Sequence, residues 1–202
     1  MKNLVFLTLA VCAAGSASAD LTTLYGSNNN GASGGMVYFD AVVNANALTV
    51  TGFDTNYNGT DAFTYEVWTR PGTFVGNAGS SAGWTMVATG TGIGAGDDLA
   101  SSVTLSNSFV LGASATTGFA LRLTGSPVGH EYTNGTGSNQ TYSNADLTLN
   151  LGAADNTPFA GAGFSPRVWN GTIKYSAVPE PATFAVLGLG ALALIRRRRT
   201  VK

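Results

Sequence analysis

Residues 63–70 read FTYEVWTR, and this stretch decides the fold class. Phe63, Tyr65 and Val67 occupy every second position, which is the period of a β-strand that buries one face. Residues 36–43 (MVYFDAVV) are rich in the same β-branched and aromatic residue types. The sequence around them is poor in the residues that build amphipathic helices, so a β-sheet domain is expected.

Nine strands are expected between glycine-, asparagine- and serine-rich joints. They are Met36–Val43, Leu48–Phe53, Phe63–Arg70, Trp84–Thr89, Ser101–Ser106, Ser108–Leu111, Gly118–Thr124, Asp146–Leu151 and Gly171–Tyr175. No period of about 20–50 residues repeats, which argues against a solenoid or propeller. We predict an all-β fold, an antiparallel β-sandwich of jelly-roll type, with long loops at 76–83, 90–98 and 130–143.

The amino-terminal residues 1–19 have the pattern of a signal peptide. A basic start (Met1–Asn3) precedes an apolar run (Leu4–Ala14), which predicts the signal-peptide helix, and Ala17-Ser18-Ala19 has the small–x–small pattern of a cleavage site. We expect signal peptidase to cut between Ala19 and Asp20. Residues 20–177, which follow this cleavage site, then form the ectodomain.

The carboxy-terminal residues 178–202 have three parts. Pro179-Glu180-Pro181 cannot start a helix, because each proline fixes φ and lacks a donor. Ala182–Ile195 is apolar on all sides, and as a helix it would be about 21 Å long, against about 30 Å of hydrocarbon. Arg196, Arg197, Arg198 and Arg199 then stop the run on the cytoplasmic side. A short transmembrane helix over 182–195 is expected.

This order of parts resembles the carboxy-terminal sorting signal of PEP-CTERM proteins, here Pro179-Glu180-Pro181, residues 182–195 and Arg196–Arg199. The resemblance implies that a membrane enzyme, an exosortase, cleaves near the motif. It also implies release or transfer of the protein outside a bacterial cell, in a setting of biofilm and extracellular polysaccharide. It says nothing of the ectodomain.

The ectodomain is acidic and free of cysteine. Residues 20–177 hold ten Asp or Glu and four Arg or Lys, a net charge of −6, and the single cysteine of the chain, Cys12, lies in the leader. Packing rather than disulfides must therefore hold the domain together. An acidic domain without a basic patch does not bind nucleic acid through its phosphates.

Residues 54–61 (DTNYNGTD) allow two interpretations. Oxygen-bearing side chains at Asp54, Asn56 and Asn58 precede a glycine, as in the opening of a calcium loop, and Asp61 adds a carboxylate. The twelfth position of that loop is Tyr65 rather than glutamate, so the alternative is a hairpin turn at Asn58-Gly59. Asp97-Asp98 is a second place where a cation could bind, or a solvated loop tip.

Tryptophans also allow two roles. Trp68 and Trp169 could stack on sugar rings, or they could fill the core. Gly79-Ser80-Ser81-Ala82-Gly83 matches a nucleophile elbow, with His130 downstream, but no helix is expected after Ser81, as that elbow requires. His130 is the only histidine and has too few nearby ligands for zinc. We therefore expect no enzyme, and no cofactor other than calcium.

The sequence thus predicts an exported surface or matrix protein with a structural or adhesive role. It is expected to be held transiently by the carboxy-terminal helix and then delivered to the cell surface or the extracellular matrix. A carbohydrate-binding module of the same fold is the alternative. Signal peptidase, an exosortase and extracellular polysaccharide are the expected partners.

Overall fold

The structure is a computed structural model that describes residues 18–178. Residues 1–17 of the predicted leader lie outside the described residues, as do Pro179–Pro181, Ala182–Ile195 and Arg196–Arg199. Between residues 18 and 178, no helix has the length and apolarity that a membrane crossing requires.

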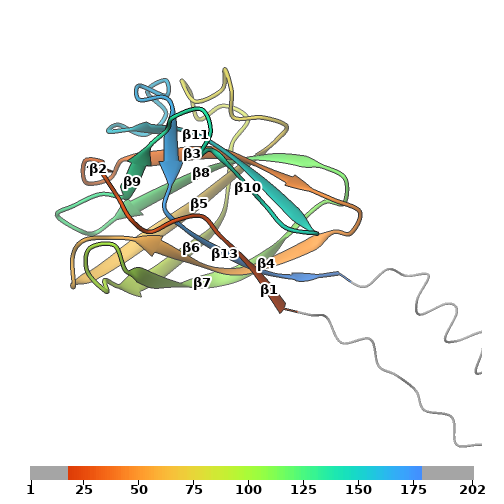
Figure 1. The fold of residues 1–202 in the computed structure, drawn as a ribbon, viewed down its shortest axis with the longest axis horizontal. Coiled ribbons are helices and arrows are strands. Elements are labelled where there is room, and N and C mark those ends of the chain that lie inside the picture. The colour runs from red at the N-terminus through yellow and green to blue at the C-terminus, as the bar shows by residue number, and fades with distance from the viewer. Residues whose placement is uncertain (1–17, 179–202) are drawn as a thin grey trace, which may run out of the picture. The chain divides into compact units, whose positions relative to one another are not determined.

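Thirteen strands make up the secondary structure of residues 18–178 (Figure 1). They are β1 (Ser18–Thr22), β2 (Asn29–Asn30), β3 (Met36–Val43), β4 (Leu48–Asn56), β5 (Ala62–Pro71), β6 (Thr85–Ile93), β7 (Ala100–Leu111), β8 (Thr116–Thr124), β9 (Glu131–Asn134), β10 (Thr141–Ser143), β11 (Leu147–Asp155), β12 (Arg167–Trp169) and β13 (Gly171–Ala177). The predicted all-β class is confirmed.

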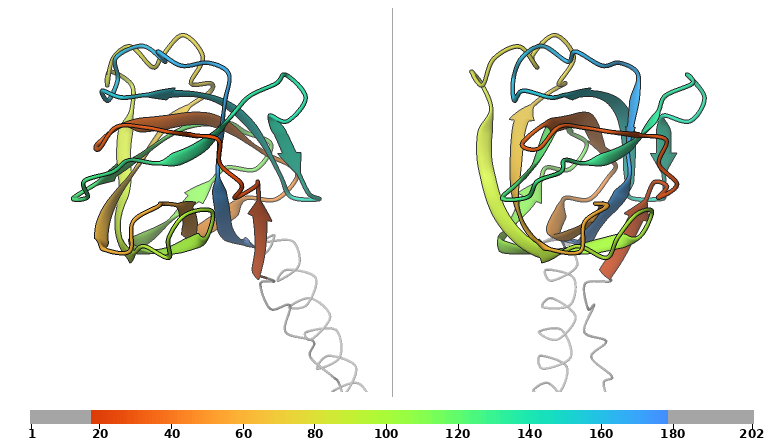
Figure 2. Two further views of the ribbon diagram at one scale, coloured as in Figure 1. Left: turned by 60° about the vertical axis from the view of Figure 1, so that its left-hand side comes forward. Right: turned by 90° about the vertical axis from the view of Figure 1, so that its left-hand side faces the viewer.

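Ten strands form one antiparallel sheet in the order β1-β13-β4-β7-β6-β5-β8-β3-β11-β10, and β12-β9-β2 form a second, three-stranded sheet. Figure 2 shows the strands of the large sheet curving around a common interior. Its two edges approach each other, since Asn144, just after β10, donates from Nδ2 to the Tyr175 hydroxyl of β13 at 2.7 Å. One curled sheet therefore replaces the predicted sandwich of two sheets.

Irregular pairing explains why the sheet can curl. The register shifts between Val50 and Gly52 where β4 pairs with β7, and between Leu151 and Ala153 where β11 pairs with β3. It also shifts between β13 and β4 and between β5 and β6. Such irregularities bend strands and increase their twist. Alternation of side chains predicts a buried face, but it does not distinguish a curled sheet from two stacked ones.

Aromatic side chains fill the interior of the curled sheet. The ring of Phe39 stacks on that of Phe119 with centroids 5.2 Å apart and on that of Trp169 with centroids also 5.2 Å apart. Phe53 meets Trp169 edge-on at 6.1 Å. Because Trp169 belongs to β12, the three-stranded sheet contributes directly to the core of the ten-stranded one.

A second apolar cluster lies on the outer face of β3, where loops cover the sheet. Tyr38 is buried there against Phe74, Trp84 and Phe159. Its hydroxyl accepts the main-chain N–H of Phe159 at 2.9 Å. Strand β3 is thus buried on both faces, which accounts for its nearly continuous apolar sequence.

The chain enters and leaves the described domain at one end of the sheet. Ser18 of β1 pairs with Ser176 of β13, and the N–H of Val178 donates to the carbonyl of Ala47 at 2.8 Å. The opposite end of the same strands is marked by the pairing of Asn56 with Ala100. The predicted cleavage residues Ala19 and Asp20 lie in β1, and the cleavage itself stays a prediction.

Replacing Trp169 with alanine should destabilise the protein by about 3–5 kcal/mol, because the substitution empties the middle of the interior stack. Trp68→Ala is the matched control, since Trp68 is partly exposed on the outer face, and it should cost clearly less. Urea unfolding of both purified variants measures the difference. Equal losses would contradict the assignment of Trp169 to the core.

Candidate functional site

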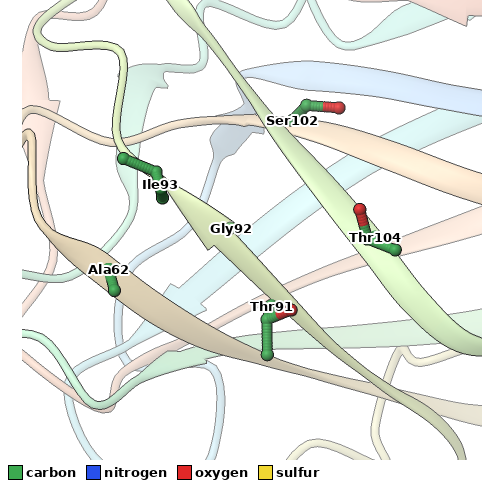
Figure 3. Close-up of a pocket in the computed structure, with 6 residues that line it drawn as sticks. All are labelled: Ala62, Thr91, Gly92, Ile93, Ser102 and Thr104. Atoms are coloured by element: carbon green, nitrogen blue, oxygen red, sulfur yellow. The ribbon is translucent and has the colours of Figure 1, made fainter.

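A depression on the described surface lies over β5, β6 and β7 and has a volume of about 520 Å³ (Figure 3). It is lined by Ala62, Thr91, Gly92, Ile93, Ser102 and Thr104. The lining offers hydroxyl groups and one isoleucine, but no titratable or aromatic side chain. Such a surface can form hydrogen bonds with a ligand, but it cannot perform acid–base chemistry.

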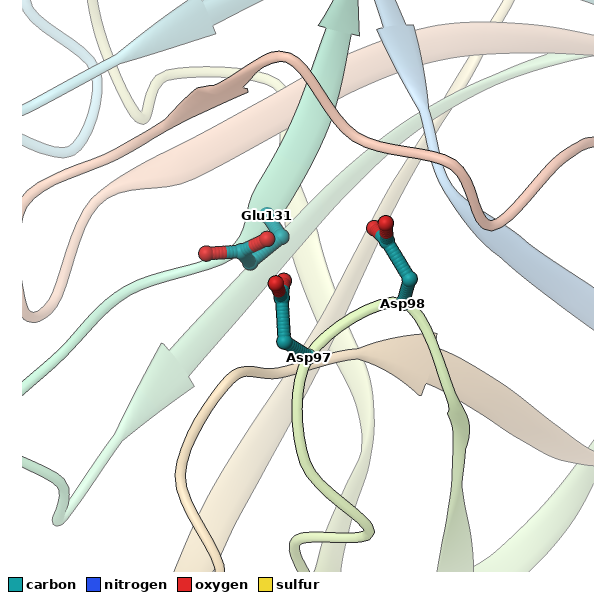
Figure 4. Close-up of side chains that lie close together, drawn as sticks. All are labelled: Asp97, Asp98 and Glu131. Carbon is teal, nitrogen blue, oxygen red and sulfur yellow. The ribbon is translucent and has the colours of Figure 1, made fainter.

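Three carboxylates meet at the end of the sheet opposite the chain ends. Asp97 and Asp98 lie in the loop between β6 and β7, and Glu131 begins β9. Each offers an oxygen atom, and these oxygens lie within 4.8 Å of one another. Figure 4 shows the two aspartates projecting from their loop toward Glu131.

The segment between β1 and β2 holds the cluster together. The N–H of Ser27 donates to Asp98 Oδ1 at 2.7 Å, and the Ser27 hydroxyl donates to Glu131. From the other side, Asn56 Nδ2 donates to Asp98 Oδ1 at 3.3 Å and to the carbonyl of Tyr25 at 2.7 Å. Residues far apart in sequence therefore fix the carboxylates of Asp98 and Glu131.

The electrostatics of the cluster are unbalanced. Burial raises the pKa of Glu131, which is 6% exposed, and the neighbouring Asp97 carboxylate acts in the same direction. The hydrogen bond from Ser27 lowers the pKa of Asp98. The ion pairs found within residues 18–178 join Arg122 to Glu66 and Lys174 to Asp54, so neither supplies a positive charge to the cluster.

Only part of the predicted calcium loop, residues 54–61, lies near the three carboxylates. Asn56 contacts Asp98, and the side chain of Asn58 acts to lower the pKa of Glu131. Asp54 instead pairs with Lys174, Oδ1 to Nζ 2.6 Å, and Asp61 is an exposed residue outside the group of three carboxylates. A consecutive calcium loop is thus not what the fold builds.

The alternative interpretation of residues 54–61, a hairpin turn at Asn58-Gly59, is wrong. Strands β4 and β5 are not neighbours in the sheet, because β4 lies between β13 and β7. Sequence reasoning found Asp97-Asp98 but missed Glu131 as their partner. No local signal joins residues 34 positions apart, and only the pairing of distant strands brings them together.

The two tryptophans singled out for sugar stacking lie in different places. Trp169 is 1% exposed and belongs to the interior stack, so it offers no ring face to a sugar. Trp68 is partly buried, with its ring edge-on to Phe159 at 5.4 Å and its Nε1 donating to Glu66 at 3.0 Å. Only Trp68 keeps a partly exposed ring, and the two do not form one platform.

His130 and Ser81 lie on different faces of the sheet. His130 is buried in the interior, where its Nδ1 lies 3.2 Å from Thr55 Oγ1 and its ring packs edge-on against Tyr65. Ser81 is exposed in the loop between β5 and β6, which packs Phe74 and Trp84 onto the outer face. The geometry therefore does not bring this serine and this histidine together as a catalytic pair.

A comparison with protein-family models matches residues 177–199 to the PEP-CTERM protein-sorting motif. The chain carries a PEP-CTERM sorting motif. The matched residues include Pro179–Pro181 and Arg196–Arg199, as the sequence predicted. No curated protein matches the chain.

The PEP-CTERM motif marks an exported protein that an exosortase, a membrane enzyme, processes. Its first matched residue, Ala177, is also the last residue of β13. Within the described residues only Val178 follows, hydrogen-bonded to Ala47. The folded domain therefore ends where the sorting motif begins, without a linker between them.

Acid should destabilise the domain through His130. Burial lowers the pKa of His130 from 6.5 to about 4, so the fold favours the neutral ring. The stabilisation is complete above pH 6.5 and is lost as the pH falls from 6.5 toward 4, by about 3 kcal/mol in total.

Urea unfolding of the wild type and of His130→Gln at pH 7.5 and 4.5 measures this effect. The difference between the two curves removes the contribution of the carboxylates, which titrate in both proteins. We expect the wild type to lose more stability than the variant. An identical pH dependence in both would show that His130 does not carry the effect.

Proposed function

We propose that the protein is an exported bacterial surface or matrix protein whose folded domain has a non-catalytic structural or adhesive role. The observation that carries this proposal is the PEP-CTERM motif at residues 177–199, directly continuous with the last strand. After processing, the destination we propose is the cell surface or the extracellular polymer.

The position of β13 supports processing without loss of the fold. β13 lies between β1 and β4 and pairs with both along its length. Its last residue, Ala177, precedes Pro179-Glu180-Pro181, so removal of the tail beyond the motif leaves these pairings in place. The domain can thus stay folded after its sorting signal has been removed.

The character of the described surface supports a structural rather than a catalytic role. The serine and histidine of the possible hydrolase are held apart by the sheet, and the depression over β5, β6 and β7 is lined in part by hydroxyl groups. The hydroxyl-rich depression also supports the second candidate, a carbohydrate-binding module. Binding of the processed protein to extracellular polysaccharide distinguishes the two candidates.

Replacing Pro179-Glu180-Pro181 with three alanines should block processing in the native host. Each proline fixes φ and lacks an N–H donor, so alanines remove this restriction on the backbone, and they also remove the carboxylate of Glu180. We expect the full-length protein to accumulate in the membrane fraction. One tag within the ectodomain and a second at the carboxy terminus allow the full-length form to be detected there.

The matched control replaces Thr200, Val201 and Lys202 with alanine, since these residues lie beyond the matched segment. This control should be processed and released like the wild type. An unchanged release of the variant with three alanines at 179–181 would refute the sorting assignment.

A further inference from the structure

We propose that Asp97, Asp98 and Glu131, together with the carboxamide of Asn56, bind a divalent cation of the calcium class. Three carboxylates converge here from two distant parts of the chain, with oxygens within 4.8 Å of one another. Carboxylate and amide oxygens are the ligands that calcium takes in proteins.

Asn56 supplies the observation that is independent of the acids. This residue is completely buried, and its carboxamide faces Asp98, with Nδ2 3.3 Å from Asp98 Oδ1. Its Oδ1 has no hydrogen-bond partner among the described residues. A buried amide oxygen without a partner costs about 1–3 kcal/mol, so a native structure needs a use for it.

A bound cation gives that oxygen a use. The two ends of a carboxamide have nearly the same shape, and they can exchange places by rotation of the group. This exchange gives up the two hydrogen bonds of Nδ2, to Asp98 Oδ1 and to the carbonyl of Tyr25, and brings Asn56 Oδ1 beside both of these oxygens, so a bound cation has to hold the three oxygens together. Oxygens alone would then face the cation.

The donor set favours calcium over the transition metals. Zinc prefers imidazole and thiolate ligands, whereas the ectodomain has no cysteine and His130 points toward Thr55 in the interior. Magnesium requires a more regular octahedron than groups from an open loop provide. Calcium modules outside cells bind with dissociation constants of about 10⁻⁴–10⁻³ M, a range that suits a site with two exposed aspartates.

The ion would act as a clamp on three segments of the chain. It would join the β6–β7 loop to the start of β9, and through Ser27 it would hold the segment after β1. It would also neutralise the repulsion between Asp97 and the buried Glu131, for which no basic side chain is at hand among residues 18–178. Calcium should therefore stabilise the fold.

The test is thermal unfolding of the full-length chain in detergent micelles, in a chelator and in about 5 mM calcium or magnesium at constant ionic strength, a concentration above the expected dissociation constant. Calcium should raise the melting temperature of the wild type more than magnesium does. Asp97→Asn should weaken calcium binding at least tenfold in a titration.

Two further comparisons make the test specific. In the chelator, Asp97→Asn should be at least as stable as the wild type, because it removes a like charge beside Glu131. Asp61→Asn, an exposed carboxylate outside the cluster, should keep the full calcium response. Absence of a calcium response in the wild type, an equal response to magnesium, or an undiminished response of Asp97→Asn would each overturn the proposal.

Discussion

The stacking of Trp169 on Phe39 is the interaction on which the rest of the domain depends. It joins β12 of the three-stranded sheet to β3 of the curled one, with ring centroids 5.2 Å apart. Residues 20–177 have no cysteine, so packing of this kind has to do what disulfides do in many small exported domains. Its consequences reach the surface, because Trp169 pairs with Tyr132 of β9, and Glu131 is the next residue back along that strand. The acidic cluster is therefore held in place from the interior.

Much of the fold could be predicted where one face of a strand is buried. Met36–Val43 was predicted with the bounds that β3 has, and the alternating stretch at 63–70 lies within β5. The two strands predicted on either side of Asn107 are one strand, β7. The predicted break coincides with an irregularity, since no residue of β4 pairs with residues 105–108. The polar residues Ser106, Asn107 and Ser108 thus mark a bulge rather than an end.

The parts of the structure that could not be predicted from the sequence are those that depend on pairing between residues far apart in the chain. The polar excursion at 130–143, expected to be a loop, contains β9 and β10, because pairing with β12 and β11 supplies the stability that their composition lacks. Likewise, curling of the sheet and the meeting of Glu131 with Asp97 follow from pairings over long separations. The sorting motif, in contrast, depends on the order of local features, and it was predicted in full.

The start of the matched sorting motif and the acidic cluster lie at opposite ends of the described domain. The sheet delivers the chain to the PEP-CTERM motif at the end where Ser18 pairs with Ser176. The carboxylates gather at the other end, where β4 and β7 begin to pair at Asn56 and Ala100.

Native-state hydrogen exchange tests most directly whether the interior stack unites the two sheets. If it does, the most protected amides of β9 and β12 should exchange with the same free energy as those of β3 and β8, which is that of global unfolding. Exchange of β9 and β12 at a much lower free energy would show that the three-stranded sheet opens independently. The interior stack would then not be the interaction that holds the domain and its acidic cluster together.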